Sequence, residues 1–399
     1  MKTKVKQKCK ITLEELFEHK NAFVSLKKCH ASVDYKYSVQ SYSCLPIFKI
    51  DNSIDIILSG LIPEIQNKKY IFIRERGKER KITPICMEDR VIQRVICDYA
   101  LLPALKGKLI YDNGASTKGK GVDFARQRTA LFIEKAKRRY RTNDLFVLKF
   151  DVKSYFDSIP HKQCYRVLTE LFEDTRIINL IMGIIESYKL IEINQIKDEK
   201  KREIELKKLY NHEYVGICLG SQISQIMALA VLNKFDHYIK DKLGIKFYIR
   251  YMDDGIIIHN DKQVLNKIMA ELHEQIAKYG MHFNKKKTYI TKASKGFAFL
   301  KVKYYITDTG KVVKKLDQGG IIRMRRKMKK YVNKVKEGKM TYDDVYTSMQ
   351  SWLAHSKIAH SFHAARNMIK LYNELFGGYK LTREYYKSHP KERCKRKVA

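Results

Sequence analysis

Two adjacent carboxylates interrupt a segment that otherwise has the pattern of a buried β-hairpin. Lys246–Tyr251 and Gly255–His259 are rich in β-branched and aromatic residues, and Met252, Asp253 and Asp254 join them. Neighbouring carboxylates in such a place repel each other and are costly to desolvate. A divalent cation would remove both costs. An ordinary Asp-Asp-Gly hairpin turn is the alternative, and this segment alone does not decide between them.

A third carboxylate follows a second apolar strand. Residues 145–150, Leu-Phe-Val-Leu-Lys-Phe, are predicted to form a buried strand that ends at Asp151. One Asp on this strand and two on an adjacent hairpin would supply the carboxylates for a pair of Mg²⁺ ions. Phosphodiester synthesis uses two such ions, about 4 Å apart. Asp157, six residues after Asp151, is interpreted as a turn or helix-cap residue.

The charge of the chain points to a polyanionic partner. Its 399 residues include 80 Lys and Arg against 43 Asp and Glu, a net charge of +37, while the 44% apolar content suffices for a core. Nucleic acid is the expected partner, and an anionic membrane surface is the alternative. No apolar run approaches a membrane span, and the eight cysteines are scattered singly, so we expect reduced thiols and a cytoplasmic protein.

Hydrophobic periodicity predicts the remaining elements. Residues 70–82 are predicted to form a hairpin with a charged turn, and residues 87–106 a helix. A helix is also expected directly after Gly220. The densely charged residues 190–212 are interpreted as an extended insertion or a solvated helix pair. Residues 320–378 are predicted to be helical and very basic.

Three of these blocks, in this order, resemble the palm motifs of reverse transcriptases: the strand end at Asp151, the block Gly220–Gln225, and Tyr-Met-Asp-Asp. The resemblance runs from about residue 40 to 375. It implies an α/β (α+β) right-hand polymerase, with fingers, a palm of antiparallel sheet plus helices, and a helical thumb. The expected divisions are 1–40 (basic N-terminal extension), 41–310 (fingers and palm), 311–379 (helical thumb) and 380–399 (basic tail).

The same resemblance implies roles around the metal ions. Asp151 and Asp253 match the metal ligands, with Val152 beside them, and Asp254 matches the third catalytic carboxylate. Lys287 matches the lysine near the leaving pyrophosphate, a candidate general acid. The expected cofactors are two Mg²⁺ ions, with Mn²⁺ as an alternative, and the expected substrates are deoxynucleoside triphosphates.

Further positions match the nucleotide site. Lys78 and Arg80 on the first hairpin match the basic residues that hold the incoming triphosphate, for which a guanidinium is well suited. Phe156, five residues after Asp151, matches the gate that excludes a ribose 2′-hydroxyl. The alternative for Phe156 is a core aromatic residue. The product is therefore expected to be DNA.

The block that begins at Leu219 and Gly220 departs from the pattern of retroviral and intron-encoded enzymes. Those enzymes usually begin it with Gln and end it with Ser-Pro, whereas this chain has Leu219 and ends with Ser224-Gln225. This variant resembles the reverse transcriptases of diversity-generating retroelements. Another departure is Lys301, which follows Phe299-Leu300 where the family's primer-grip turn usually has Gly.

The resemblance therefore implies a bacterial or phage-encoded RNA-directed DNA polymerase that makes adenine-mutagenised cDNA from a template-repeat RNA. Its expected partners are the RNA template, the RNA/DNA duplex and a small oligomeric helical accessory protein, with no membrane. The alternatives are another bacterial enzyme (retron, antiphage defence or free-standing group II intron-like) and a non-catalytic RNA-binding protein on a polymerase scaffold. Because nothing nuclease-like follows the thumb, we do not expect an intron maturase with an endonuclease.

Overall fold

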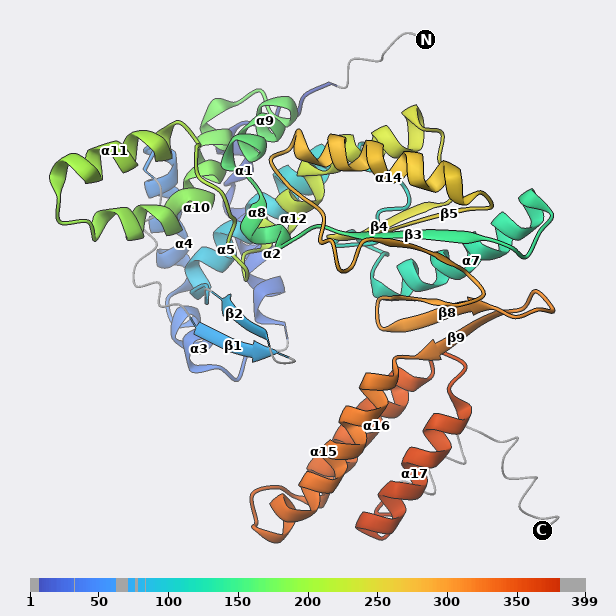
Figure 1. The fold of residues 1–399 in the computed structure, drawn as a ribbon. Helices are drawn as coiled ribbons and strands as arrows, with labels where there is room; N and C mark the ends of the chain where they lie inside the picture. Colours follow the sequence, from blue (N-terminus) through green and yellow to red (C-terminus); the bar gives the residue numbers. More distant parts are fainter. Residues whose placement is uncertain (1–6, 32, 62–70, 76–77, 83, 381–399) are drawn as a thin grey trace. The chain divides into compact units, whose positions relative to one another are not determined.

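The computed structural model describes residues 7–31, 33–61, 71–75, 78–82 and 84–380 (Figure 1). The chain divides into two compact units, which are described in turn. The first comprises Met1–Gly121, Lys149–Ile257 and Asn266–Tyr289, and the second comprises Val122–Leu148, Ile258–Leu265 and Ile290–Ala399. Within the described ranges, no helix combines the length and the apolar character that crossing a membrane requires.

The first unit begins with short helices that pack on one longer helical segment. These are α1 (Leu13–Leu16), α2 (His19–His30), α3 (Tyr37–Ser43), α4 (Pro46–Leu58), α5 (Met87–Val95), η1 (Ile96–Leu101) and α6 (Leu102–Leu105). The segment from α5 to α6 is the helix predicted over 87–106, and the π-helical turn η1 lies in its middle. Buried Val91, Val95 and Ile96 give it the apolar face that the sequence indicated.

The predicted hairpin at residues 70–82 is confirmed. Strand β1 (Ile71–Glu75) pairs antiparallel with β2 (Lys78–Ile82), with Ile73 opposite Arg80. The side chains of Lys78 and Arg80 lie outside the described part of the structure, so their assignment to the triphosphate stays a prediction.

A four-stranded sheet carries the carboxylates. Its strands are β3 (Phe146–Asp151), β4 (Tyr248–Tyr251), β5 (Asp254–His259) and β6 (Tyr289–Lys292), in the order β4-β5-β3-β6. The expected strand ending at Asp151 and the expected second hairpin are both present. The helices between them in the chain are α8 (Tyr155–Ser158), α9 (His161–Leu171), α10 (Thr175–Asn194), α11 (Glu199–Tyr210), α12 (Gln222–Val231), α13 (Asn233–His237), η2 (Tyr238–Lys242) and α14 (Lys262–Ala277).

An aromatic cluster fixes β3 against β5 and the neighbouring helix. The Phe150 ring packs 5.1 Å from Phe283, 6.1 Å from Phe235 and 6.2 Å from Tyr248, measured between ring centroids. On the β5 side, the ring lies over Gly255: a Cβ atom at that position would stand 2.1 Å from Phe150 Cζ. Glycine is therefore required immediately after Asp254 for the two strands to approach this closely.

The charged insertion forms a helix pair rather than an extended segment. Helix α11 runs back beside the end of α10 (Figure 1). Only Leu209 of α11 is buried, and most of its charged side chains form i,i+3 or i,i+4 pairs, such as Lys207 with Glu203. The solvated helix pair was thus the correct interpretation of the two offered for residues 190–212.

The second unit contains α7 (Val122–Tyr140), the three-stranded antiparallel sheet β7 (Phe297–Phe299), β8 (Val302–Ile306) and β9 (Val312–Leu316), and a helical bundle. Leu300 and Lys301 form the two-residue turn between β7 and β8, with φ of +48° and +68°. The turn therefore lies where the motif placed it, and the positive φ at 301 explains why glycine suits that position.

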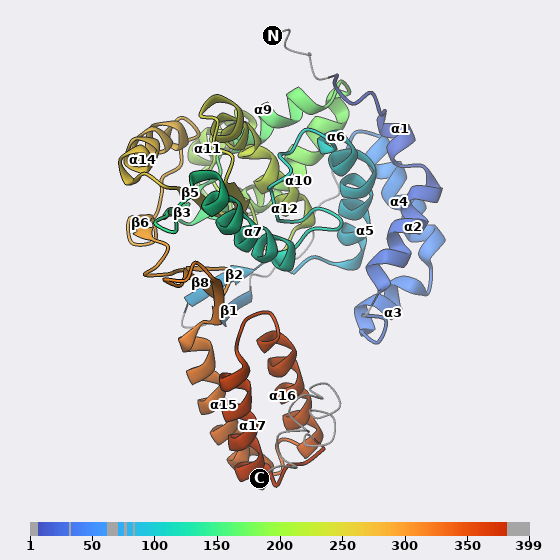
Figure 2. The ribbon, with the colours of Figure 1, turned by 90° about the vertical axis from the view of Figure 1, so that its right-hand side faces the viewer.

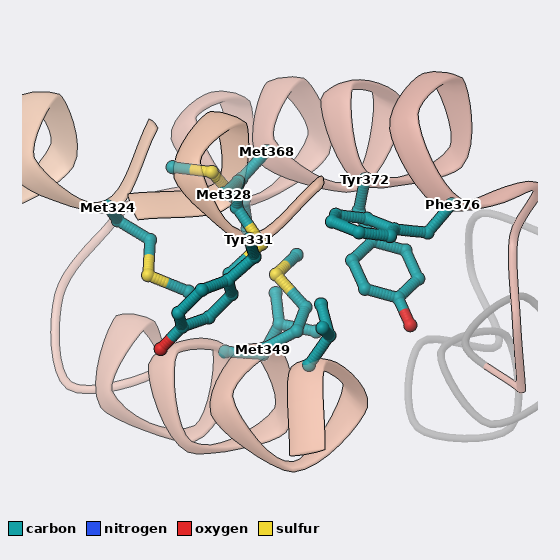
Figure 3. Packing of buried hydrophobic residues seen from close by; sticks show 10 residues of the cluster. Met324, Met328, Tyr331, Met349, Met368, Tyr372 and Phe376 are labelled. Carbon is teal, nitrogen blue, oxygen red and sulfur yellow. The ribbon is translucent and has the colours of Figure 1, made fainter. Parts of the chain in front are cut away.

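Three helices make up the basic C-terminal bundle: α15 (Gln318–Lys336), α16 (Tyr342–Ser356) and α17 (Phe362–Phe376). They lie side by side in both views (Figures 1 and 2) and confirm the helices predicted over 320–378. Their shared core contains the methionines Met324, Met328, Met349 and Met368 beside Tyr372 and Phe376 (Figure 3). The expected basic tail lies outside the described residues except for Lys380.

Candidate active site

The turn between β4 and β5 is tight and strained. Tyr251 pairs with Asp254, so only Met252 and Asp253 lie between the strands. Met252 has φ +54°, in the left-handed region. A residue with a Cβ atom pays about 1–2 kcal/mol to adopt that conformation, so neighbouring contacts must hold the turn in place.

Strand β3 meets this turn directly. The Val152 amide donates to the Asp253 carbonyl at 3.2 Å, and the Asn284 amide donates to the Asp151 carbonyl at 2.8 Å. The Asp151 side chain is buried, whereas Asp253 and Asp254 are half-buried. The end of one strand and the tip of one hairpin thus bring together the three carboxylates that the sequence singled out.

The three carboxylates repel one another. Burial, followed by the charges of Asp254 and Asp151, raises the pKa of Asp253 to about 6. Burial also raises the pKa of Asp254, and the Lys149 ammonium opposes that rise. Such a cluster favours binding of cations, because a cation offsets both desolvation and like-charge repulsion.

Two lysines neutralise part of this negative charge. Lys287 Nζ donates to Asp151 Oδ1 at 2.6 Å, and Lys149 Nζ lies 3.6 Å from Asp254 Oδ1. Burial lowers the pKa of Lys287, but the hydrogen bond and charge of Asp151 outweigh it, and the pKa is raised overall. Lys287 was expected here and Lys149 was not. Because β-strand side chains alternate, Lys149 points to the same face as Asp151, two residues later.

The donor set suits a hard divalent cation. Asp151 Oδ2 is buried and accepts no hydrogen bond from the described residues. Carboxylate oxygens are the ligands that Mg²⁺ and Mn²⁺ prefer. In the described part of the chain, no group of three His, Cys, Asp or Glu side chains forms a ready candidate ion site. Val152 is buried and pairs with Phe283; its expected part in metal binding stays a prediction.

A second group of expected residues lies on the segments that follow the carboxylates. Phe156, on the short helix α8, is half-buried, and its carbonyl accepts from the Ile217 amide at 2.9 Å. This bond joins Phe156 to the loop that contains Leu219, which is half-buried, and Gly220, which has φ +119°.

Helix α12 begins directly after this loop. Its N-cap Ser221 donates to Gln93 Oε1 at 2.8 Å and accepts from the Ser224 amide. Gln225 is exposed on the first turn of the helix. A buried ion pair between Arg250 and Asp236, behind the carboxylates, was not singled out from the sequence. The available signal was an arginine in an otherwise apolar strand.

The fold and these contacts place three carboxylates at one strand end and one hairpin turn, and comparison with known proteins identifies the family of the chain. The family described as "Reverse transcriptase (RNA-dependent DNA polymerase)" matches residues 65–304. This match spans more than half of the chain, so the protein belongs to the reverse transcriptase family. The expected α+β right-hand polymerase fold class is confirmed with it.

Three similar proteins of known sequence or structure are each less than 25% identical to this chain. The "Putative COX1/OXI3 intron 2 protein" of Saccharomyces cerevisiae is 24% identical over 212 residues, covering 38% of this chain and only 23% of that protein. A truncated apo telomerase from Candida tropicalis is 17% identical, with TM-score 0.44 over 68% of this chain and 60% of that one. A telomerase from Candida albicans, in complex with a telomeric RNA fragment, is 14% identical, with TM-score 0.45 over 66% and 50%.

Proposed function

We propose that this protein is an RNA-directed DNA polymerase that uses two divalent metal ions. The observation that carries the proposal is the meeting of Asp151, Asp253 and Asp254 at the β3 end and the β4–β5 turn, where the Val152 amide donates to the Asp253 carbonyl. Asp151 and Asp253 would hold the two Mg²⁺ or Mn²⁺ ions, with Asp254 as third carboxylate and Val152 alongside. When bound, the ions activate the primer 3′-hydroxyl and hold the triphosphate.

Lys287 supplies the proton for the leaving group in this scheme. Its ammonium, kept protonated beside Asp151, has a hydrogen to donate to the departing pyrophosphate. A metal ion held by Asp151 would compete with Lys287 for that carboxylate, which would leave the ammonium free to donate. Lys78 and Arg80 are proposed to hold the triphosphate.

Phe156 is proposed to select the sugar. It follows Ser154, which has φ +47°, and its backbone is tied to Ile217. A bulky ring held beside the sugar would clash with a 2′-hydroxyl, and DNA is therefore the proposed product.

The C-terminal bundle offers a surface for the RNA template and the RNA/DNA duplex. A groove of about 460 Å³ lies between α15 and α17, and its rim carries the exposed basic residues Arg325, Arg326, Lys329 and Lys370. Such an array binds phosphate and helix shape without reading sequence.

We further propose that the enzyme belongs to a diversity-generating retroelement and makes adenine-mutagenised cDNA from a template-repeat RNA. Leu219, in place of Gln, presents no hydrogen-bonding group to check the nascent base pair, which supports looser selection. A small oligomeric helical accessory protein is the proposed partner. An intron-related or other bacterial enzyme is the second candidate, supported by the match to the yeast intron protein. A non-catalytic RNA-binding protein is the third.

Primer extension on an RNA template tests the polymerase proposal. The parent protein should extend the primer, and the Asp253→Asn variant should lose nearly all activity because it removes a metal ligand. Asp157→Asn is the matched control: Asp157 is an exposed carboxylate six residues after Asp151, and its variant should extend normally. Equal extension by the parent and the Asp253→Asn variant would refute the assignment.

Sequencing the cDNA separates the retroelement classes. Errors concentrated opposite template adenines support the diversity-generating type. Low and uniform errors across the four template bases would favour the intron-related or retron-like alternatives. Replacing Leu219 with Gln should then reduce the adenine-directed errors if this position sets selectivity.

A further inference from the structure

A charged pair lies in the apolar interior behind the Met252–Asp253 turn. Arg250 lies in β4, three residues before Asp253, and Asp236 is the last residue but one of the short helix α13. Both side chains are fully buried, at 0% exposure. Arginine and aspartate are rarely enclosed to this extent unless every polar group finds a partner.

Nearly all of the Arg250 guanidinium is used. Nε and Nη2 donate to the two carboxylate oxygens of Asp236 at 2.7 and 2.6 Å, which is the bidentate geometry of a strong pair. Nη2 also donates to the Leu229 carbonyl at 3.2 Å, and Nη1 donates to the Met252 carbonyl at 2.8 Å. Tyr248 donates its hydroxyl to Asp236 Oδ1 at 2.7 Å, which holds the carboxylate from a third side.

The contact with Met252 reaches the strained residue of the turn. Met252 has the left-handed φ of +54°, and its carbonyl accepts a hydrogen bond from Arg250. The next carbonyl, of Asp253, accepts a hydrogen bond from the Val152 amide. Two consecutive peptide groups are thus fixed in direction. The Asp253 side chain leaves the backbone between them, so these two hydrogen bonds set the direction in which its Cα–Cβ bond points.

The backbone of Arg250 is fixed as well. Its amide donates to the Asp112 carbonyl at 3.2 Å, and its carbonyl accepts from the Gly114 amide at 2.9 Å. The guanidinium therefore projects from a residue whose amide and carbonyl are both held by the segment from Asp112 to Gly114. An arm anchored in this way can transmit a position to the turn, whereas a loose side chain could not.

Stability alone does not account for a charged pair at this place. A buried ion pair gains little over well-packed apolar side chains of similar volume, because its desolvation cost cancels most of its attraction. An apolar pair would leave the Met252 carbonyl without its donor. What only the arginine provides is the hydrogen bond to the Met252 carbonyl in the turn.

We propose that Arg250, oriented by Asp236, is a positioning residue that fixes the direction of the Asp253 carboxylate for cation binding. This inference rests on the proposed two-metal polymerase activity. The effect of Arg250 is exerted on the geometry of the Met252–Asp253 turn. Arg250 does not touch substrate or metal. Its effect reaches the chemistry only through the Met252 carbonyl.

The test compares two variants. The triple variant Asp236→Leu, Tyr248→Phe and Arg250→Met replaces the whole polar cluster with apolar side chains of similar size, so that no buried charge is left unpaired. Arg250→Lys keeps a positive charge for Asp236, but a single ammonium cannot form the bidentate pair and reach the Met252 carbonyl together. The control replaces an exposed pair elsewhere in the same unit, Lys234→Gln with Glu170→Gln.

Two readouts separate positioning from folding. Mn²⁺ titration of the free protein, followed by electron paramagnetic resonance, should show affinity weakened on the order of 10–100-fold in the triple variant, as for partners that orient a metal ligand. Its thermal unfolding midpoint should stay near that of the parent. In primer extension, kcat should fall by a similar factor while KM for the nucleotide is unchanged. The control should match the parent in every assay.

Parental Mn²⁺ affinity in a folded triple variant would overturn the proposal. If the triple variant does not fold, Arg250→Lys decides: weakened Mn²⁺ binding in a natively folded Lys variant supports positioning, and parental binding refutes it. A parent protein that binds Mn²⁺ in an Arg250-dependent way but extends no primer would refute the polymerase function and leave the positioning role standing.

Discussion

Substitution of Gly255 by alanine tests the packing that sets the carboxylate site. The added Cβ atom would lie 2.1, 2.3 and 2.7 Å from the Phe150 ring atoms Cζ, Cε2 and Cε1, well inside van der Waals contact. The ring cannot retreat, because Phe235, Tyr248 and Phe283 surround it. The strands must therefore separate next to Asp254.

The expected cost is at the upper end of the range for an overpacked core, about 3 kcal/mol. For a unit of this size, that corresponds to a fall in the thermal unfolding midpoint of about 6–12 °C. The assay is thermal unfolding followed by circular dichroism. Gly121→Ala is the matched control, because a Cβ atom at Gly121 meets nothing within 4 Å, and its midpoint should not change.

A double-mutant cycle tests whether the Phe150 ring is the obstacle to a side chain at position 255. Phe150→Leu shortens the obstructing side chain, so Gly255→Ala should cost less in that background than in the parent, with a coupling above about 1 kcal/mol. Additive effects, or a parental midpoint for Gly255→Ala alone, would show that the strand contact is not what demands glycine.

Three further outcomes follow from the same geometry. Asp253→Asn should raise the unfolding midpoint in EDTA at pH 8, because the carboxylate pKa, raised to about 6 by burial and its acidic neighbours, makes ionisation costly to the fold. This gain in the unfolding midpoint should shrink as the pH falls through 6 and vanish near the pKa of Asp253 in the unfolded chain. A gain independent of pH would contradict the ionisation cost assigned to Asp253. Lys301→Gly should stabilise the protein by about 1 kcal/mol in denaturant unfolding, since the φ of +68° suits glycine, and destabilisation would refute the turn assignment. Phe156→Ala should admit ribonucleotides in primer extension. Unchanged discrimination between deoxyribonucleotides and ribonucleotides would show that Phe156 is a core aromatic residue instead.

Local patterns in the sequence were sufficient for the main elements. The aromatic and β-branched residues on the two sides of Asp253 predicted the hairpin, and the apolar residues before Asp151 predicted the strand. These features depend on neighbours in the chain, which periodicity records. The turn at Leu300 and Lys301 also lies where the family pattern after Phe299 placed it, although Lys301 departs from that pattern.

Long-range polar pairing could not be predicted in the same way. Lys149 was read only as part of an apolar strand, although the alternation of side chains put it on the Asp151 face. Arg250 and Asp236 are 14 residues apart and meet only because β4 packs on α13. No spacing rule specifies which buried acid an isolated strand arginine will find. Such partners become visible only when the tertiary structure is known.

The methionine-rich interior of the C-terminal bundle has a chemical consequence. Met328, Met349 and Met368 are fully enclosed, and Met324 lies at the same interface (Figure 3). Thioethers are flexible enough to fill a core that changes shape, but oxidation turns each into a polar sulfoxide that such a core cannot accommodate. Peroxide that reaches these side chains during transient opening would therefore loosen the bundle by a route independent of the carboxylates, and sulfoxide reduction would restore it.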